Sequence, residues 1–215
     1  MPDLEIIGAP WGNFVRTVRM ACVEKGVPYT LNVVKPHEGL VAAIHPLGMV
    51  PCLRHGEVTL CESRAICTYI DMAFPGPPLV PADPVAAAVQ EQWISLVLTT
   101  FDPVLARQYL VTYINAPGGT PAPEAVSAIM PRVRDCFGVL EQRLAAVPYL
   151  AGAAFSLADM FLFPLMWFMR LKPESAALLQ GSPAIAAWYT RVAARESAVL
   201  TEPPAPTGPP APCKV

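Results

Sequence analysis

The sequence predicts an α/β domain followed by an all-helical domain. Short strand-like runs alternate with helical patterns over residues 1–75, and a proline-rich stretch interrupts the chain at 76–84. Beyond that stretch, apolar residues recur only at helical spacing. Proline-rich segments are typical of linkers between domains. We therefore expect an N-terminal domain over 1–75, a linker over 76–84, a helical domain over 85–200 and a proline-rich tail over 201–215.

The N-terminal domain is expected to combine strands with helices. Its first helix has a start signal at Asn13, whose side chain can cap free N–H groups, and a stop signal at Gly26. His55-Gly56 is typical of a turn between two short strands. The expected elements, in chain order, are strand 4–7, helix 13–26, strand 29–34, a loop and short helix over 35–44, strands 52–54 and 58–61, and helix 63–74. This β-α-β-α-β-β-α order is that of a thioredoxin-like domain, so the fold class is an α/β thioredoxin-like N-terminal domain plus an all-α C-terminal domain.

The second domain is identified by apolar periodicity. An apolar stripe recurs every four residues from Val89 to Phe101, and Pro103 is expected to kink or divide that helix. The stripe serves either the core of the domain or a partner protein. Ser156 and Asp159 have the spacing of a reciprocal cap at a helix start. Further helical signals lie at 126–144, which contains Pro131, and from Ser156 and Pro183 onwards.

The composition restricts the partners and the compartment. A net charge of −2 argues against a nucleic-acid or anionic-membrane partner. The six cysteines show no metal-ligand spacing, so we expect no metal site, and reduced thiols favour a cytoplasmic location. The start of the chain lacks the pattern of a secretory signal, and the longest apolar run, 160–169, is too short to span a membrane. We therefore expect a globular cytoplasmic protein.

Two neighbouring motifs are the candidates for chemistry. Pro51 follows Gly48-Met49-Val50, and because proline cannot donate a main-chain hydrogen bond, it indicates a fixed turn, compatible with a cis bond, before the next strand. Glu62-Ser63 stands where the following helical pattern begins. The unsatisfied N–H groups at a helix start attract anions. The helix start at Glu62-Ser63 can therefore hold an anion.

These motifs resemble the two glutathione-binding segments of the soluble glutathione transferases. The resemblance rests on His45–Pro51 and Glu62–Ile66, and the succession of an α/β and a helical domain is similar to that family over about residues 4–200. It implies the glutathione transferase fold, a homodimer, glutathione as co-substrate and a hydrophobic electrophile as second substrate. The branch it resembles is the bacterial theta- or phi-like or Asn-type one. The implied glutathione-binding residues are Lys35, His37, Met49, Val50, Pro51, Glu62 and Ser63.

The resemblance also implies what the binding residues do. The residue before the proline, Val50, pairs its main chain with the cysteinyl part of glutathione, and the bond to the proline is cis. Glu62 and Ser63 hold the amino and carboxylate ends of the γ-glutamyl group. Lys35 or His37 contacts the glycine carboxylate. The alternatives are that Ser63 only caps its helix and that the charged side chains are ordinary solvated residues.

The chain departs from the family pattern at the residue that activates the glutathione thiol. In the serine-type branches, a serine at the start of the first helix donates a hydrogen bond to the thiolate, and Gly12 stands at that position here. Asn13 is the nearest side-chain donor and is our candidate catalytic residue. Alternatively, Asn13 only caps the helix, and main-chain N–H groups near Gly12 and Asn13 stabilise the thiolate.

Aromatic residues are candidates for the pocket of the second substrate. One group lies beside the expected thiol and another on the first long helix of the second domain, although aromatic residues at helical spacing also serve as core. The candidate pocket residues are Trp11, Phe14, Phe101, Tyr109 and Tyr113.

Three functional hypotheses follow. The first is a glutathione transferase that adds the glutathione thiolate to hydrophobic electrophiles. Gly12 and Met49, where many relatives have other residues, favour the second: a transferase-like binding or interaction protein with little catalysis. The third keeps glutathione but changes the reaction to peroxide reduction or isomerisation.

Overall fold

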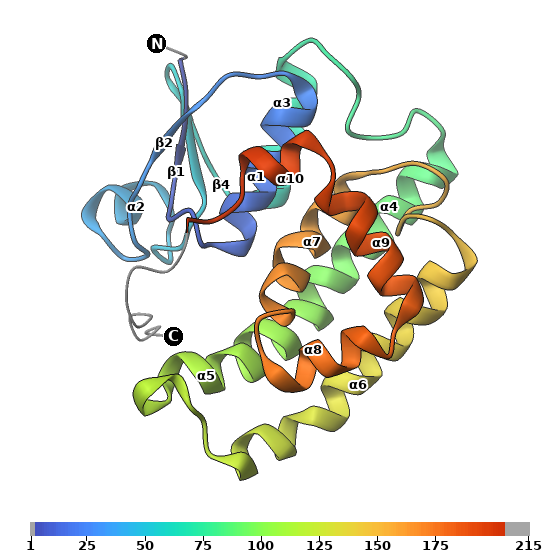
Figure 1. Cartoon of the computed structure of the whole chain (residues 1–215). Coiled ribbons are helices and arrows are strands. Elements are labelled where there is room, and N and C mark those ends of the chain that lie inside the picture. Colours follow the sequence, from blue (N-terminus) through green and yellow to red (C-terminus); the bar gives the residue numbers. More distant parts are fainter. Residues whose placement is uncertain (1–2, 205–215) are drawn as a thin grey trace. The chain divides into compact units, whose positions relative to one another are not determined.

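The computed structural model describes residues 3–204, which form two compact units (Figure 1). The first unit contains residues 3–82 together with Ala193–Pro204, and the second contains Asp83–Val192. Of the expected proline-rich tail, residues 205–215 lie outside the described residues.

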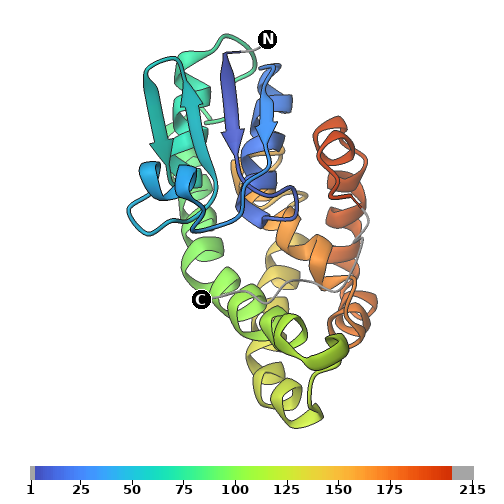
Figure 2. The ribbon, with the colours of Figure 1, turned by 90° about the vertical axis from the view of Figure 1, so that its left-hand side faces the viewer.

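A four-stranded mixed sheet forms the centre of the first unit, with its strands side by side in Figure 2. The strand order is β2-β1-β3-β4; β1 runs parallel to β2 and antiparallel to β3, and β3 and β4 form a hairpin. The element order is the predicted thioredoxin-like one. The elements are β1 (Leu4–Ile7), α1 (Asn13–Lys25), β2 (Thr30–Asn32), α2 (Gly39–Ile44), β3 (Cys52–His55), β4 (Val58–Cys61) and α3 (Ser63–Ala73).

Successive side chains of a strand point to opposite faces of the sheet, and helices cover both faces here. Ile6 and its register partner Leu53 are fully buried towards α1 and α3, which lie on one side of the sheet in Figure 1. Ile7 and Cys52 point to the opposite face, where they pack with Val41 of α2. Burying each large apolar side chain contributes about 1.5–3 kcal/mol. The apolar runs of the sequence therefore become strands with both faces covered near their inner residues.

The hairpin between β3 and β4 has a two-residue turn, Gly56-Glu57. Gly56 has a φ of +56°, whereas Glu57 does not have a positive φ, which is the pattern of a type II′ turn. The sequence placed the turn one residue earlier, at His55-Gly56. His55 instead ends β3 and pairs with Val58.

Residues 193–204 return to the first unit and pack on α1 through the short helix α10 (Glu196–Leu200). The buried guanidinium of Arg16 donates from Nη2 to the main-chain oxygen of Ala198 at 3.0 Å. The sequence assigned 85–200 to the helical domain, whereas in the structure 193–204 belong to the first unit. Apolar periodicity within a segment carries no signal for the distant helix that α10 contacts.

The second unit is entirely helical among its described residues. Its elements are α4 (Pro84–Leu96), η1 (Val97–Leu110), α5 (Val111–Asn115), η2 (Pro117–Gly119), α6 (Pro123–Ala146), α7 (Leu157–Met169), α8 (Pro173–Gln180) and α9 (Pro183–Ala193). The first three form one continuous run, because the backbone keeps right-handed helical angles at the junctions Val97 and Val111.

Pro103 does not break this run. It lies inside η1, a π-helical segment whose turns are wider than those of an α-helix. Proline cannot donate the main-chain hydrogen bond of a regular helix, and its ring crowds the carbonyl four residues earlier. The expected disruption by Pro103 thus coincides with a wider helix rather than a division.

The apolar stripe of α4 and η1 faces the core of its own unit. Trp93, Val97 and Phe101 are buried, and the rings of Trp93 and Phe101 stack with centroids 6.5 Å apart. Of the two roles that the sequence left open for the stripe, the structure favours the core.

The predicted reciprocal cap forms at the start of α7. The buried carboxylate of Asp159 accepts hydrogen bonds from the N–H and the hydroxyl of Ser156, from the N–H of Leu150 at 2.9 Å and from the indole of Trp188 at 2.8 Å. Asp159 therefore ties the start of α7 to the preceding loop and to α9.

Candidate functional site

The register of the sheet brings four loops to one edge. Ile7, at the end of β1, pairs with Asn32 at the end of β2 and with Cys52 at the start of β3, and Cys52 pairs with Cys61 at the end of β4. The segments that follow β1, β2 and β4 and the segment that precedes β3 therefore meet at the same edge. These segments contain every expected glutathione-binding residue and Asn13.

The loop after β1 lies against Val50, the residue that precedes Pro51. Gly8 packs so closely that a Cβ atom added to it would lie 3.2 Å from the Cβ of Val50. The bond between Val50 and Pro51 is cis, as the resemblance predicted. Val50 thus lies directly beside the loop that leads into α1.

Glu62 has a backbone conformation that is unusual for a residue with a side chain. Its φ is +68° and its ψ is 111°, and it stands immediately before α3 with its side chain 73% exposed. Ser63, by contrast, is buried as the first residue of the helix. Such backbone angles are costly and concentrate at functional sites. They leave the Glu62 carboxylate accessible at a helix N-terminus.

His45 orients the Glu62 carboxylate. The buried imidazole accepts the N–H of Leu47 at Nδ1, 3.0 Å away, so the neutral ring carries its proton on Nε2 and donates it to Glu62 Oε1 at 3.2 Å. His45 is not among the expected site residues. The two partners are 17 positions apart, and only the pairing of α2 with the end of β4 brings them together.

The N-terminus of α1 has a glycine at its cap position. Gly12 precedes the helix with extended backbone angles, and Asn13 is the first helical residue. The sequence assigned the cap to Asn13; the structure places the cap one residue earlier, at a residue without a side chain. The first-turn N–H groups of α1 therefore have no acceptor from a cap side chain. Asn13 is half-buried at this end of the helix.

The remaining expected contacts lie around the same edge. Lys35 and His37 are exposed in the loop after β2, and Met49 is half-buried just before Val50. The N–H of His37 donates to the main-chain oxygen of Gly48 at 2.7 Å, which joins this loop to the turn before β3. The two basic candidates thus flank the edge with exposed side chains.

The aromatic candidates divide between the two units. In the first unit Trp11 is 41% exposed, donates its indole N–H to the main-chain oxygen of Pro204 at 3.0 Å, and lies two residues before Asn13. Phe14 is half-buried in the first turn of α1. Of the candidates in the second unit, Phe101 is part of the stripe packed in the core.

The two tyrosines of the second unit share one carboxylate. The hydroxyl groups of Tyr109 and Tyr113 both donate to Glu174 Oε2. Burial, and then the hydrogen bond to Glu174, raises the pKa of Tyr113 above its usual range. Both phenols are therefore neutral donors over the physiological range.

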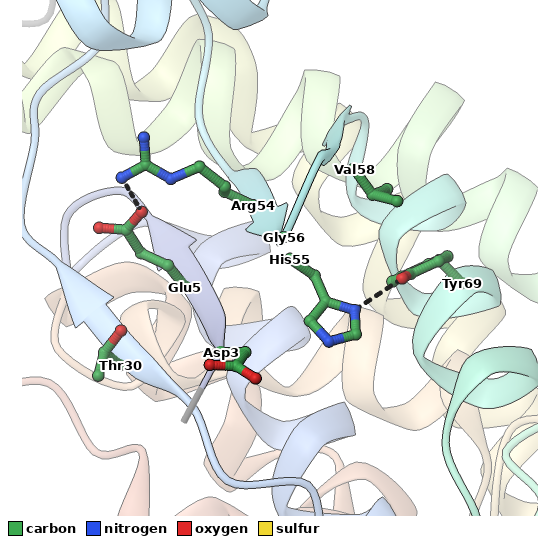
Figure 3. Close-up of a pocket in the computed structure, with 8 residues that line it drawn as sticks. All are labelled: Asp3, Glu5, Thr30, Arg54, His55, Gly56, Val58 and Tyr69. Carbon is green, nitrogen blue, oxygen red and sulfur yellow. Dashed lines mark hydrogen bonds and ion pairs between the residues drawn. The ribbon is translucent and has the colours of Figure 1, made fainter. Parts of the chain in front are cut away.

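A separate pocket of about 600 Å³ lies at the opposite end of the sheet. Figure 3 shows its lining residues, among which Arg54 forms an ion pair with Glu5 and His55 shares a hydrogen bond with Tyr69 at 2.7 Å. Four of its polar lining groups therefore pair with one another. It contains none of the expected site residues.

The described residues contain no cluster of three or more His, Cys, Asp or Glu side chains that could hold a metal ion. Within residues 3–204, every helix is either too short or too polar to cross a membrane.

Comparison with known proteins identifies the family. The profile of the glutathione S-transferase N-terminal domain matches residues 6–78, and that of the C-terminal domain matches residues 123–191. Glutathione S-transferase 3 of Zea mays is 31% identical over 98% of both chains. The chain belongs to the glutathione S-transferase family.

Two other proteins similar to this chain carry different names. A stringent starvation protein A homologue of Pasteurella multocida is 33% identical over 86% of this chain and 82% of the relative. The theta-class glutathione S-transferase of Xanthomonas axonopodis pv. citri, solved with glutathione bound, superposes with a TM-score of 0.80 at 25% identity, over 94% of this chain and 97% of that one. A relative named as a stringent starvation protein A homologue and one named as a glutathione S-transferase thus have about the same sequence identity to this chain.

Proposed function

We propose that this protein is a glutathione transferase that binds glutathione at the sheet edge defined above and adds its thiolate to a hydrophobic electrophile. The observation that carries the proposal is the meeting of the loop after β1, the turn before β3 and the start of α3 at that edge. At this edge, the main chain of Val50 pairs with the cysteinyl residue of glutathione, and the Glu62 carboxylate accepts hydrogen bonds from the γ-glutamyl ammonium.

The γ-glutamyl carboxylate of the ligand binds at the N-terminus of α3, and the thiolate binds at the N-terminus of α1. The hydroxyl of Ser63 and the first N–H groups of α3 bind the γ-glutamyl carboxylate, because a helix start offers unsatisfied donors and a positive dipole end. Lys35 or His37 binds the glycine carboxylate from the loop after β2. The His45 hydrogen bond fixes Glu62 before the ligand arrives, which reduces the entropy lost on binding.

The thiol is activated at the N-terminus of α1. A free thiol has a pKa of about 8.5, and lowering it by about two units requires about 2.7 kcal/mol of preferential stabilisation of the thiolate. The uncapped N–H groups of α1 and the amide N–H of Asn13 supply this stabilisation by donating to the sulfur. The thiolate then attacks an electrophile whose apolar part contacts Trp11 and Phe14.

Calorimetric titration with glutathione tests the binding site. Replacing Glu62 with Ala is expected to weaken binding by about tenfold or more, or about 1.4 kcal/mol, because the ammonium loses its charged partner. Glu57→Ala, an exposed glutamate in the hairpin turn at the far end of β3 and β4, is the matched control and should leave binding unchanged. Equal affinities for the two variants would place the ligand elsewhere.

Asn13→Ala tests the activation of the thiol separately from binding. If the amide donates to the thiolate, the pKa of bound glutathione, followed through the ultraviolet absorbance of the thiolate, rises by about one unit or more. Glutathione affinity below that pKa should change little. An unchanged pKa would assign the activation to the main-chain N–H groups of α1 alone.

A second candidate is an interaction protein that keeps the glutathione site but catalyses little. Gly12 at the serine position and a relative named as a stringent starvation protein A homologue favour this candidate. Turnover of a chromogenic aryl halide with glutathione discriminates the two. Saturable glutathione binding without turnover of aryl halides, hydroperoxides or an isomerisable substrate would favour the interaction protein.

We also propose a homodimer, as the resemblance implies. Trp93, Val97 and Phe101 of the stripe are buried in their own unit, so the interface must use other side chains. Sedimentation of the reduced protein at micromolar concentration should give the mass of two chains. A single-chain mass over that range would contradict the dimer.

A further inference from the structure

Cys52 and Cys61 face each other across the hairpin of β3 and β4. The turn has two residues, so the flanking pair His55 and Val58 is the hydrogen-bonded kind. Opposite pairs alternate in kind along an antiparallel ladder, and Cys52–Cys61 is the third pair after that one. It is therefore a non-hydrogen-bonded pair.

This kind of pair fits the geometry of a disulfide. In non-hydrogen-bonded pairs the Cα atoms are about 4.5 Å apart and the side chains lie closer than in the other kind. Disulfides need Cα atoms about 4.4–6.8 Å apart and Cβ atoms about 3.5–4.5 Å apart. Cys52 and Cys61 also belong to the same apolar cluster, so both side chains point to the same face of the sheet. Both are reduced in the structure.

The two thiols differ in their access to solvent. Among the cysteines of residues 3–204, Cys61 alone is partly exposed, whereas Cys52 is fully buried. Burial, and then the neighbouring Cys61 and Glu62, raises the pKa of Cys52 to about 11. A small oxidant in solution therefore meets Cys61 first, and Cys52 is placed to react with the product.

Both cysteines are directly adjacent to the proposed glutathione contacts. Cys52 follows the Val50-Pro51 turn and donates its thiol to the main-chain oxygen of Met49 at 3.5 Å. Cys61 immediately precedes Glu62. A bond between the two sulfurs removes the thiol donor that holds Met49 and draws together the strand ends that position the turn and Glu62.

We propose that a hydroperoxide converts Cys52 and Cys61 into a cross-strand disulfide that weakens glutathione binding at the adjacent sheet edge. The Cys61 thiolate attacks the peroxide oxygen, which gives the sulfenic acid and releases an alcohol or water. The Cys52 sulfur then attacks the Cys61 sulfur, the S–O bond breaks, and the hydroxyl leaves as water with the proton of Cys52. Two thiols and one hydroperoxide thus yield one disulfide, one alcohol or water, and one further water. The regulatory part rests on the proposed glutathione site.

The disulfide is tested by peptide mapping of the full chain carrying Cys213→Ser, treated with hydrogen peroxide and digested with trypsin without a reductant. Trypsin cleaves after Arg54, between the two cysteines, so a disulfide leaves two peptides linked. We expect the linked pair with the mass of two hydrogens missing, its loss after dithiothreitol, and its absence in Cys61→Ser. Cys136→Ser, which removes a buried thiol of the second unit, is the matched control and should still give the linked pair. Oxidation of Cys61 without linkage to Cys52 would overturn the proposal.

The effect on binding is measured with S-methylglutathione, which cannot reduce a disulfide. We expect the oxidised protein to bind it about tenfold more weakly than the reduced protein, because displacements of about 1 Å at contact residues have large effects. Peroxide-treated Cys61→Ser should keep the affinity of its untreated form. Equal affinities of the linked and reduced proteins would overturn the switch. Failure of the reduced protein to bind S-methylglutathione would overturn the proposed function and the switch, whereas the peptide map decides the disulfide independently.

Discussion

Val15 is the side chain around which the loop before α1 is built. It is fully buried, and both Gly8 and Gly12 approach its Cγ2 atom so closely that an added Cβ would lie 2.6 Å and 2.9 Å away, respectively. A β-branched side chain has little freedom to rotate out of such a contact. The absence of a serine at position 12 therefore agrees with the packing, since a side chain there must displace Val15.

Gly12→Ala is expected to destabilise the protein by about 1–3 kcal/mol, because the new methyl group overpacks Val15. The measurement is the free energy of unfolding in urea. Gly138→Ala is the matched control: Gly138 is exposed within α6, an added Cβ meets no atom within 4 Å, and alanine is the better helix former by about 0.5–1 kcal/mol. Opposite signs for the two variants support the packing argument; equal effects would refute it.

Asp159→Ala should cost about 3 kcal/mol or more, because it leaves buried donors of Leu150, Ser156 and Trp188 without their acceptor. Thermal unfolding should show a clear fall in Tm. Asp135→Ala removes an exposed carboxylate from α6 and should change Tm little. A small effect at Asp159 would mean that water replaces the lost acceptor.

At the scale of elements, the short helix α10 depends on its contacts with α1. Its preceding residue, Arg195, forms two hydrogen bonds to the Glu24 carboxylate at 2.8 and 2.7 Å, and Ser197 adds a third at 2.6 Å. Burial alone would raise the pKa of Glu24, but these bonds outweigh it and hold that pKa below its usual range. A helix of this length has no stability of its own, so the ion pair and Arg16 hold it in place.

A double-mutant cycle with Glu24→Gln and Arg195→Met should give a coupling energy of about 1 kcal/mol, since the pair is bidentate but partly exposed. Urea unfolding of the four proteins supplies the values. A coupling energy near zero would mean that α10 is held by its apolar and main-chain contacts instead.

At the scale of the whole molecule, carboxylates with hydrogen-bonding partners make the free energy of unfolding depend on pH. Asp71 accepts hydrogen bonds from the N–H of Leu79 at 2.8 Å and from the Lys25 ammonium at 2.7 Å. Burial opposes ionisation, yet these partners outweigh it and lower the pKa of Asp71. A carboxyl group with a lowered folded-state pKa binds fewer protons than in the unfolded chain, so its contribution to stability is present above the unfolded pKa and lost as the pH falls.

The free energy of unfolding should therefore fall as the pH drops from about 5 to below the unfolded pKa of about 4. Asp71→Asn should be less stable at neutral pH and show a shallower fall in acid. Asp159 contributes to the pH dependence of stability with the opposite sign, because burial raises its pKa. Comparing the protein with Asp71→Asn therefore isolates the contribution of Asp71. Parallel pH profiles for the two proteins would contradict the assignment. The measurement is urea unfolding at a series of pH values.

The sequence predicted those features that depend on neighbouring residues. The strands, the cap of Ser156 and Asp159, and the cis bond before Pro51 each have a local signal, and all are present. The resemblance supplied the family. The Asn13 cap was misplaced by one residue, because asparagine and glycine both suit that position and only the backbone angles of Gly12 decide between them.

What the sequence did not predict depends on residues far apart in the chain. The His45 side chain contacts that of Glu62, and the Arg16 side chain contacts the main-chain oxygen of Ala198, at separations that have no periodic relation. The Cys52–Cys61 pairing requires the register of the hairpin, which follows from the turn at Gly56 rather than from the cysteine spacing. The expected binding roles of Lys35, His37 and Met49 stay predictions that ligand titrations can decide.

The return of residues 193–204 to the first unit has a consequence for how the protein is made. A ribosome synthesises the N-terminal residues first, yet Arg16 and Glu24 acquire their partners only after Arg195 and Ala198 leave the exit tunnel. The nascent first unit must therefore wait, incomplete, while the whole helical unit is translated. Completion of the proposed glutathione-binding unit is in this way tied to the synthesis of the helical unit.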